Sequence, residues 1–226
     1  MSPGDRPQDQ PGRVPGFLDL GLIALAAGYI VFVGISGVGP HLYASADRVS
    51  DGRVWLLATS SLDVANTLST IQWILLTAAV IVVIFRLGPR IWWLVALTGH
   101  IGAAILSYAV IEIAIALGSQ SADHTAAQGD YGISIVLAAT LGALTASALP
   151  FRRGPGDRMD TGDRAALWLG LLGLAGLVAV SIGWYDVQHL LGYGIGFFLA
   201  GILRKKTNWV GFDQKLNGGL HRSTQH

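Results

Sequence analysis

The chain of 226 residues contains no cysteine and few charged residues. The absence of cysteine excludes disulfide bonds, cysteine nucleophiles and thiolate metal sites. Charged residues make up only 13% of the chain, whereas hydrophobic residues make up 52%. A soluble domain needs more polar side chains to cover its surface, so this composition indicates an integral multi-pass membrane protein. The net charge of +1 is too small to indicate a nucleic-acid partner.

Long apolar segments make up most of the sequence. Crossing the hydrocarbon of a bilayer takes about 20 mostly apolar residues, and six segments have this length. They are approximately Phe17–Val38, Thr67–Leu87, Ile91–Leu117, Tyr131–Leu149, Ala165–Trp184 and Val187–Leu203. Residues 1–16 and 205–226 are expected to be tails, the first of them disordered, and residues 39–66 an external loop within a 17–204 membrane domain. The sequence therefore predicts an all-α bundle of six transmembrane helices.

The basic residues fall mainly at one predicted side of the membrane. They precede the first segment, separate the second from the third and the fourth from the fifth, and follow the sixth: Arg6, Arg13, Arg86, Arg90, Arg152, Arg153, Arg158, Arg164, Arg204, Lys205 and Lys206. Lysine and arginine in short connections favour the cytoplasmic side. Both termini are therefore predicted to be cytoplasmic.

Six ionisable residues lie in or at the ends of the apolar segments: Asp19, His100, Glu112, Asp130, Asp186 and His189. Such groups are costly in a membrane, so each is a functional candidate. The third segment runs outward, which predicts that His100 lies on the order of 15–20 Å deeper than Ser134 and does not touch it. His100 and Glu112 are candidates for a second polar site, with a structural role favoured for both.

Ser134 and His189 are expected at the same depth. Ser134 follows Asp130 by four residues and His189 follows Asp186 by three, so both lie about 4–7 Å from the outer end of their segments. A serine hydroxyl becomes a good nucleophile when a base accepts its proton, and a neutral imidazole is the usual base. Asp186 could accept a hydrogen bond from the other ring nitrogen or hold the start of the helix.

Small residues next to this pair predict close packing of the two segments. Gly192 and Gly196 follow the histidine, and Ala138 and Gly142 follow the serine. Small residues on two membrane helices let their backbones approach closely. Such an approach would bring the serine and the histidine within reach of each other.

The motifs and their order resemble the rhomboid intramembrane serine proteases over roughly residues 17–204. Gly132-Ile133-Ser134 matches most of the family's GxSG motif, and the spacing of His189, Gly192 and Gly196 matches HxxGxxxG. The stretches Gly99–Ala103, Asp130–Ser134 and Asp186–Leu190 resemble the GHxGA, DxGxS and DxxH motifs of a divergent bacterial branch. The resemblance implies a bacterial plasma-membrane protein with Ser134 as nucleophile and His189 as base.

Several positions depart from the family pattern. Ile135 replaces the glycine after the nucleophile, Ala138 replaces an aromatic residue, and Leu62 stands where the second span of the family carries a histidine. In the family, this histidine and an asparagine four residues after it help to hold the oxyanion. The resemblance therefore leaves the amide of Ser134 and the side chain of Asn66 for this role.

Two functions follow from the resemblance, and the ionisable residues suggest a third. The first is a protease that cleaves a transmembrane segment of another membrane protein near the outer face. The second is a catalytically inactive module that binds or escorts membrane-protein clients within the bilayer. The third, a metal- or proton-handling protein, would use His100, Glu112, Asp130, Asp186 and His189. The spread of these residues in depth and the absence of an HExxH pair argue against a metal site, so no metal or cofactor is expected.

Overall fold

The computed structural model describes residues 16–36, 42–62, 67–129, 132–149, 159–180 and 187–204. Every regular element in these ranges is a helix. Five helices are long and apolar enough to cross a membrane: α1 (Phe17–Ser36), α4 (Thr67–Leu87), α5 (Pro89–Ala116), α8 (Thr161–Val180) and a last helix containing the span Val187–Arg204. This confirms the prediction of an all-α, multi-pass membrane protein.

The fourth predicted segment forms α7 (Ile133–Ala148), which is shorter than the five helices named above. Its 16 residues extend about 24 Å, less than the roughly 30 Å of a bilayer's hydrocarbon core. Every side chain of α7 except that of Ser134 is buried. The helix packs against α4, α5 and α8. Because α7 is apolar on all sides, it forms the core around which the longer helices pack.

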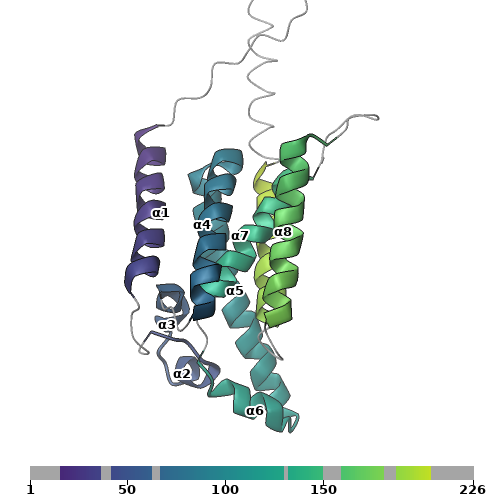
Figure 1. The fold of residues 1–226 in the computed structure, drawn as a ribbon. Coiled ribbons are helices and arrows are strands. Elements are labelled where there is room, and N and C mark those ends of the chain that lie inside the picture. The colour runs from purple at the N-terminus through teal and green to yellow at the C-terminus, as the bar shows by residue number, and fades with distance from the viewer. Residues whose placement is uncertain are drawn as a thin grey trace, which may run out of the picture.

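The longer helices expose large apolar side chains on their outward faces. Phe17 and Ile35 of α1, Phe85 of α4, Ile113 of α5 and Phe198 of the last helix are among the most exposed. In Figure 1, α1, α4 and α8 run alongside one another, and α7 lies between α4 and α8, with α1 on the far side of α4. Exposed apolar surface around a buried core is the arrangement expected of a protein whose solvent is lipid.

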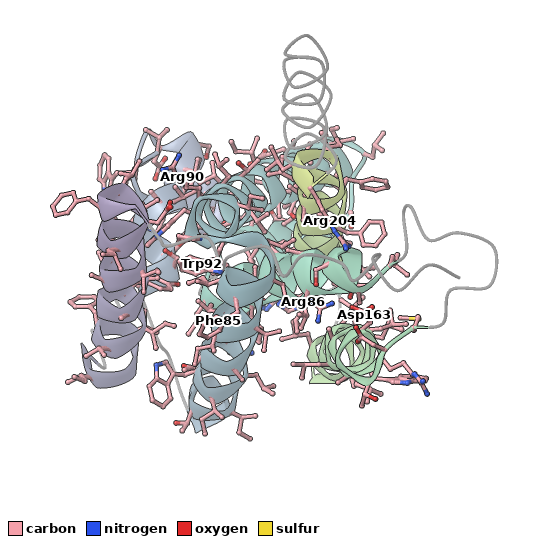
Figure 2. The ribbon with its side chains drawn as sticks, turned by 90° about the horizontal axis from the view of Figure 1, so that it is seen from above. Phe85, Arg86, Arg90, Trp92, Asp163 and Arg204 are labelled. Atoms are coloured by element: carbon pink, nitrogen blue, oxygen red, sulfur yellow. The ribbon has the colours of Figure 1, made fainter. Side chains whose placement is uncertain are left out.

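One end of the bundle, which we call the arginine end, carries paired basic residues. Arg86 at the end of α4 forms an ion pair with Asp163 of α8, and Arg90 at the start of α5 pairs with Asp19 of α1 at 2.8 Å. Figure 2 looks onto this end and shows Arg86 directed toward Asp163. The two arginines lie together because Gly88, with a φ of +90°, turns the chain directly from α4 into α5.

Arg204 joins the last helix to the end of α7. Its Nη1 donates to the backbone carbonyls of Ala146, Ser147 and Leu149 at 3.4, 2.6 and 3.3 Å. The last carbonyls of a helix have no partner within the helix. A guanidinium group that binds them stabilises the end of α7 and ties the two helices together.

The opposite end, which we call the α6 end, is closed by short helices that the sequence did not predict. They are α2 (Ala46–Ser50), α3 (Leu56–Thr59), the 3₁₀ helix η1 (Ser60–Leu62) and α6 (Gln120–Ala126). Ser45 caps α2 and Ser119 caps α6 through their hydroxyl groups. Leu56, Tyr108 and Ala122 belong to a second apolar cluster that holds these helices against the far half of α5.

α5 reaches from one end of the molecule to the other. Its 28 residues extend about 42 Å, more than a bilayer requires. Figure 1 shows α5 inclined to α1, α4 and α8 and leading to α6. One half of α5 packs in the main bundle, and the other half packs against the short helices.

The predicted helix limits agree well for some segments and poorly for others. α4 spans the predicted residues, α7 is shorter by a few residues, and α8 begins four residues earlier than expected. Apart from Gly16, the predicted tails 1–16 and 205–226 lie outside the described residues.

Candidate functional site

Ser134 lies in the first turn of α7, at the α6 end of the bundle. The helix begins at Ile133, directly after Gly132. Ser134 is half-buried, whereas the other side chains of α7 are buried. Its hydroxyl is therefore the one polar group of this core helix that the described residues do not fully cover.

His189 lies at the corresponding end of the last helix, whose described part begins at Val187. The side chain of His189 is buried, with 5% of its surface exposed, and the neighbouring Gln188 is also buried. Two adjacent polar side chains are therefore buried near the start of this helix. One of them, His189, is the residue that the sequence predicts as the base for Ser134.

Glycine contacts define how α7 and the last helix pack. A methyl group on Gly196 would overlap the carbonyl oxygen of Ala139, and one on Gly192 would lie 3.0 Å from Cγ2 of Ile135. A methyl group on Gly142 would overlap the carbonyl oxygen of Tyr193. The two backbones are therefore in direct contact, because side chains larger than hydrogen do not fit between them.

The same contacts fix the relative direction of the two helices. Ile135 meets Gly192, Ala139 meets Gly196, and the carbonyl of Ser147 meets Arg204. Residues later in α7 therefore contact residues later in the last helix, so the two helices run in the same direction. Ser134 and His189, each near the start of its helix, lie at the same end of the bundle.

His100 is part of a buried junction at the same end of the bundle. Its Nε2 lies 3.3 Å from Oγ of Ser60, and the carbonyl of Ser60 accepts a hydrogen bond of 3.1 Å from the amide of Gly132. A methyl group on Gly132 would overlap Cε1 of His100 and lie 2.8 Å from Nδ1. His100, Ser60 and Gly132 are all buried. Three elements that are distant in sequence, η1, α5 and the start of α7, therefore meet here.

The prediction that His100 lies far below Ser134 is wrong. His100 packs on Gly132, two residues before Ser134. Depth counted along the chain holds only for helices that are perpendicular to the membrane and begin at the same height. In the structure α5 is long and inclined and α7 is short, so the middle of α5 meets the start of α7.

The two candidates for a second polar site do not come together. Glu112 is exposed on α5, and it lies about 18 Å along the helix axis from His100. Nδ1 of His100 is buried and has no hydrogen-bond partner among the described residues.

Asn66, Asp130 and Asp186 lie outside the described residues. Among the residues that are described, no three His, Cys, Asp or Glu side chains are grouped so that they could hold a metal ion. Ser60 is the site residue that the sequence did not indicate. It belongs to a segment without a clear periodic pattern. Only the folded structure shows that it contacts α5 and the start of α7.

The chain was compared with protein-family models, curated proteins and solved structures. None of them matches it. Function must therefore be inferred from the residues of the chain and their geometry.

Proposed function

We propose that this protein is a rhomboid-like intramembrane serine protease with six spans, α7 being the short central one. Ser134 is the nucleophile and His189 is the general base. The observation that carries this proposal is the close packing of α7 against the last helix, which runs in the same direction, with backbone contact at Gly142, Gly192 and Gly196. Such contact supports a Ser–His pair held on two rigid helices rather than on loops.

The reaction follows from these two groups. His189 accepts the proton of the Ser134 hydroxyl while Oγ attacks the carbonyl carbon of the scissile peptide bond. The proton then passes to the leaving amine as the peptide bond breaks. Water hydrolyses the resulting acyl-enzyme, with His189 again as the base, and the serine hydroxyl is restored.

The oxyanion formed during attack requires hydrogen-bond donors. The amide of Ser134 belongs to the first turn of α7, the positive end of the helix dipole, which favours a developing negative charge. We assign this amide and the side chain of Asn66 as the donors. Losing one such donor lowers the rate by about 10²–10³-fold in serine proteases, so a site with few donors is expected to be slow.

The substrate is a transmembrane segment of another membrane protein, cut near the outer face. The clustering of Arg86, Arg90 and Arg204 supports a cytoplasmic arginine end. The α6 end, and with it Ser134, is then close to the outer face. A helical substrate must unwind locally there, because its intrahelical hydrogen bonds shield the carbonyl groups from attack.

A fluorophosphonate probe, which reacts with activated serines, tests the proposal. We expect the purified protein in detergent to be labelled, and Ser134→Ala and His189→Ala to lose labelling while remaining folded. Ser107→Ala is the matched control, since Ser107 is a buried serine of α5 whose hydroxyl bonds to Ala103 of its own helix. Labelling that persists in Ser134→Ala would refute the assignment.

A second candidate function is an inactive rhomboid-like module that binds membrane-protein clients. It is favoured by Ile135, which occupies the position of a family glycine and is fully buried against Gly192. A bulky side chain there restricts movement next to Ser134. If folded wild-type protein is not labelled, this candidate is preferred, and it requires client binding to survive Ser134→Ala and to be lost in Gly192→Leu.

A further inference from the structure

The junction of Ser60, His100 and Gly132 is a buried polar contact between three separate elements. Ser60 and His100 expose 1% and 2% of their surface. Buried polar groups of this kind stabilise a structure only when they are bonded, and they then hold their partners in one arrangement. None of the catalytic steps described above uses Ser60 or His100.

The contacts of Ser60 bind it to both neighbours. Its hydroxyl oxygen lies 3.3 Å from Nε2 of His100, and its carbonyl oxygen accepts the Gly132 amide at 3.1 Å. The hydroxyl can donate to or accept from the imidazole, depending on the tautomer of the ring. The imidazole therefore orients the same residue that holds the amide of Gly132.

Gly132 in turn controls the first turn of α7. Its carbonyl accepts hydrogen bonds of 3.1 Å from the amides of Ile135 and Val136. The peptide groups on both sides of Gly132 are thus bonded, one to Ser60 and one to the helix. Ser134 lies within the turn that these bonds close.

The absence of a side chain at Gly132 is part of the same arrangement. The imidazole of His100 fills the space that a Cβ at position 132 would need. The ring is confined, because it is buried and its Nε2 is bonded to Ser60. The start of α7 therefore rests directly on the Cε1 edge of the ring.

We propose that Ser60 and His100 are positioning residues for Ser134. They hold the amide of Gly132 against η1 and α5, and so set the direction in which the Ser134 hydroxyl points from the first turn of α7. Neither residue takes part in the proposed reaction steps. The consequence for reaction rate rests on the proposed function, whereas the consequence for the position of residue 134 does not.

The first experiment measures fluorophosphonate labelling as separate kinact and KI values. Misplacement of a nucleophile by about 1 Å can lower a rate on the order of 10²-fold. We expect a loss of this size in kinact for His100→Ala, with KI unchanged. His100→Gln should recover most of the rate, because a glutamine amide can donate to or accept from the Ser60 hydroxyl. Ser107→Ala serves as the control on α5.

The second experiment does not depend on catalysis. Because the chain has no cysteine, Ser134→Cys introduces a single thiol at the site. We expect a polar maleimide to react several-fold faster with this thiol when His100→Ala is also present, since the first turn of α7 is then released. His100→Gln should return the rate toward that of the Ser134→Cys protein. If His100→Ala does not fold, Ser60→Ala removes only the hydroxyl and is measured in the same way.

The outcomes separate the two proposals. Equal thiol rates in the His100→Ala and Ser107→Ala backgrounds would overturn the inference, as would an unchanged kinact in labelled protein. The wild-type protein could fail to react with fluorophosphonate while His100→Ala still changes the maleimide rate at Ser134→Cys. That result would support the positioning role and refute the protease.

Discussion

Gly196 lies directly against the backbone of Ala139. A methyl group on Gly196 would overlap the Ala139 carbonyl oxygen and lie 2.7 Å from the carbonyl carbon. Backbone atoms cannot move aside as the end of a flexible side chain can. The contact between α7 and the last helix, on which the proposed Ser134–His189 pair depends, therefore requires glycine at this position.

The first prediction is that Gly196→Ala destabilises the protein. Overpacking of a close contact typically costs about 1–3 kcal/mol, and the two helices must separate to accommodate the methyl group. Thermal unfolding in detergent measures the effect. Gly194→Ala is the control on the same helix, because a methyl group there meets no atom within 4 Å. Equal unfolding temperatures for the two variants would contradict the close packing of Gly196 on α7.

The second prediction concerns the ion pair between Arg86 and Asp163. Their side chains are 25% and 10% exposed, compared with 59% and 25% for Arg90 and Asp19. Arg86→Ala should cost about 1–3 kcal/mol, because it leaves buried polar groups without the guanidinium. Arg90→Ala should cost about 0–1 kcal/mol, as is usual for exposed pairs. Chemical denaturation of both variants checks the order, and a larger loss in Arg90→Ala would contradict it.

The third prediction is non-additivity between Gly132 and His100. Gly132→Ala should destabilise the protein by about 1–3 kcal/mol because its methyl group overlaps the imidazole. His100→Ala removes the ring and hence the overlap. The loss of unfolding free energy in the double variant should therefore be smaller than the sum of the two single losses, by about 0.5–3 kcal/mol. Additive losses in a double-mutant cycle would mean that the two residues are not in contact.

The fourth prediction concerns the attachment of α1. Nε1 of Trp73 in α4 donates to the carbonyl of Ile30 at 2.7 Å, and its ring occupies the space beside Gly34. Trp73→Phe keeps much of the ring but loses the hydrogen bond, at a cost of about 0.5–1.5 kcal/mol. Hydrogen exchange should increase in α1 and remain unchanged in α7. The control is Trp168→Phe, since Trp168 is 59% exposed on α8.

The composition and the lengths of the apolar segments determined the class of this protein and the positions of several helices. The apolar segments are long enough to fix the class, and the limits of α4 could be read directly from the sequence. The glycines at 192 and 196 predicted a close contact because few other features of a membrane helix call for small residues at that spacing. The sequence also placed Ser134 and His189 near the start of their helices, where the structure has them, whereas their pairing stays a prediction.

The tertiary structure alone decided how the helices incline and what the connections do. Counting residues gives a depth only for a helix perpendicular to the membrane, and the tilt of a helix is set by its packing partners. His100 was therefore misplaced, although its residue type had marked it as important. The short helices α2, α3 and α6 are stabilised mainly by tertiary contacts rather than by their own helix propensity, so no local sequence pattern predicted them. Ser60 acquired its place beside His100 and Gly132 for the same reason: its partners are distant in sequence and meet only when the chain is folded.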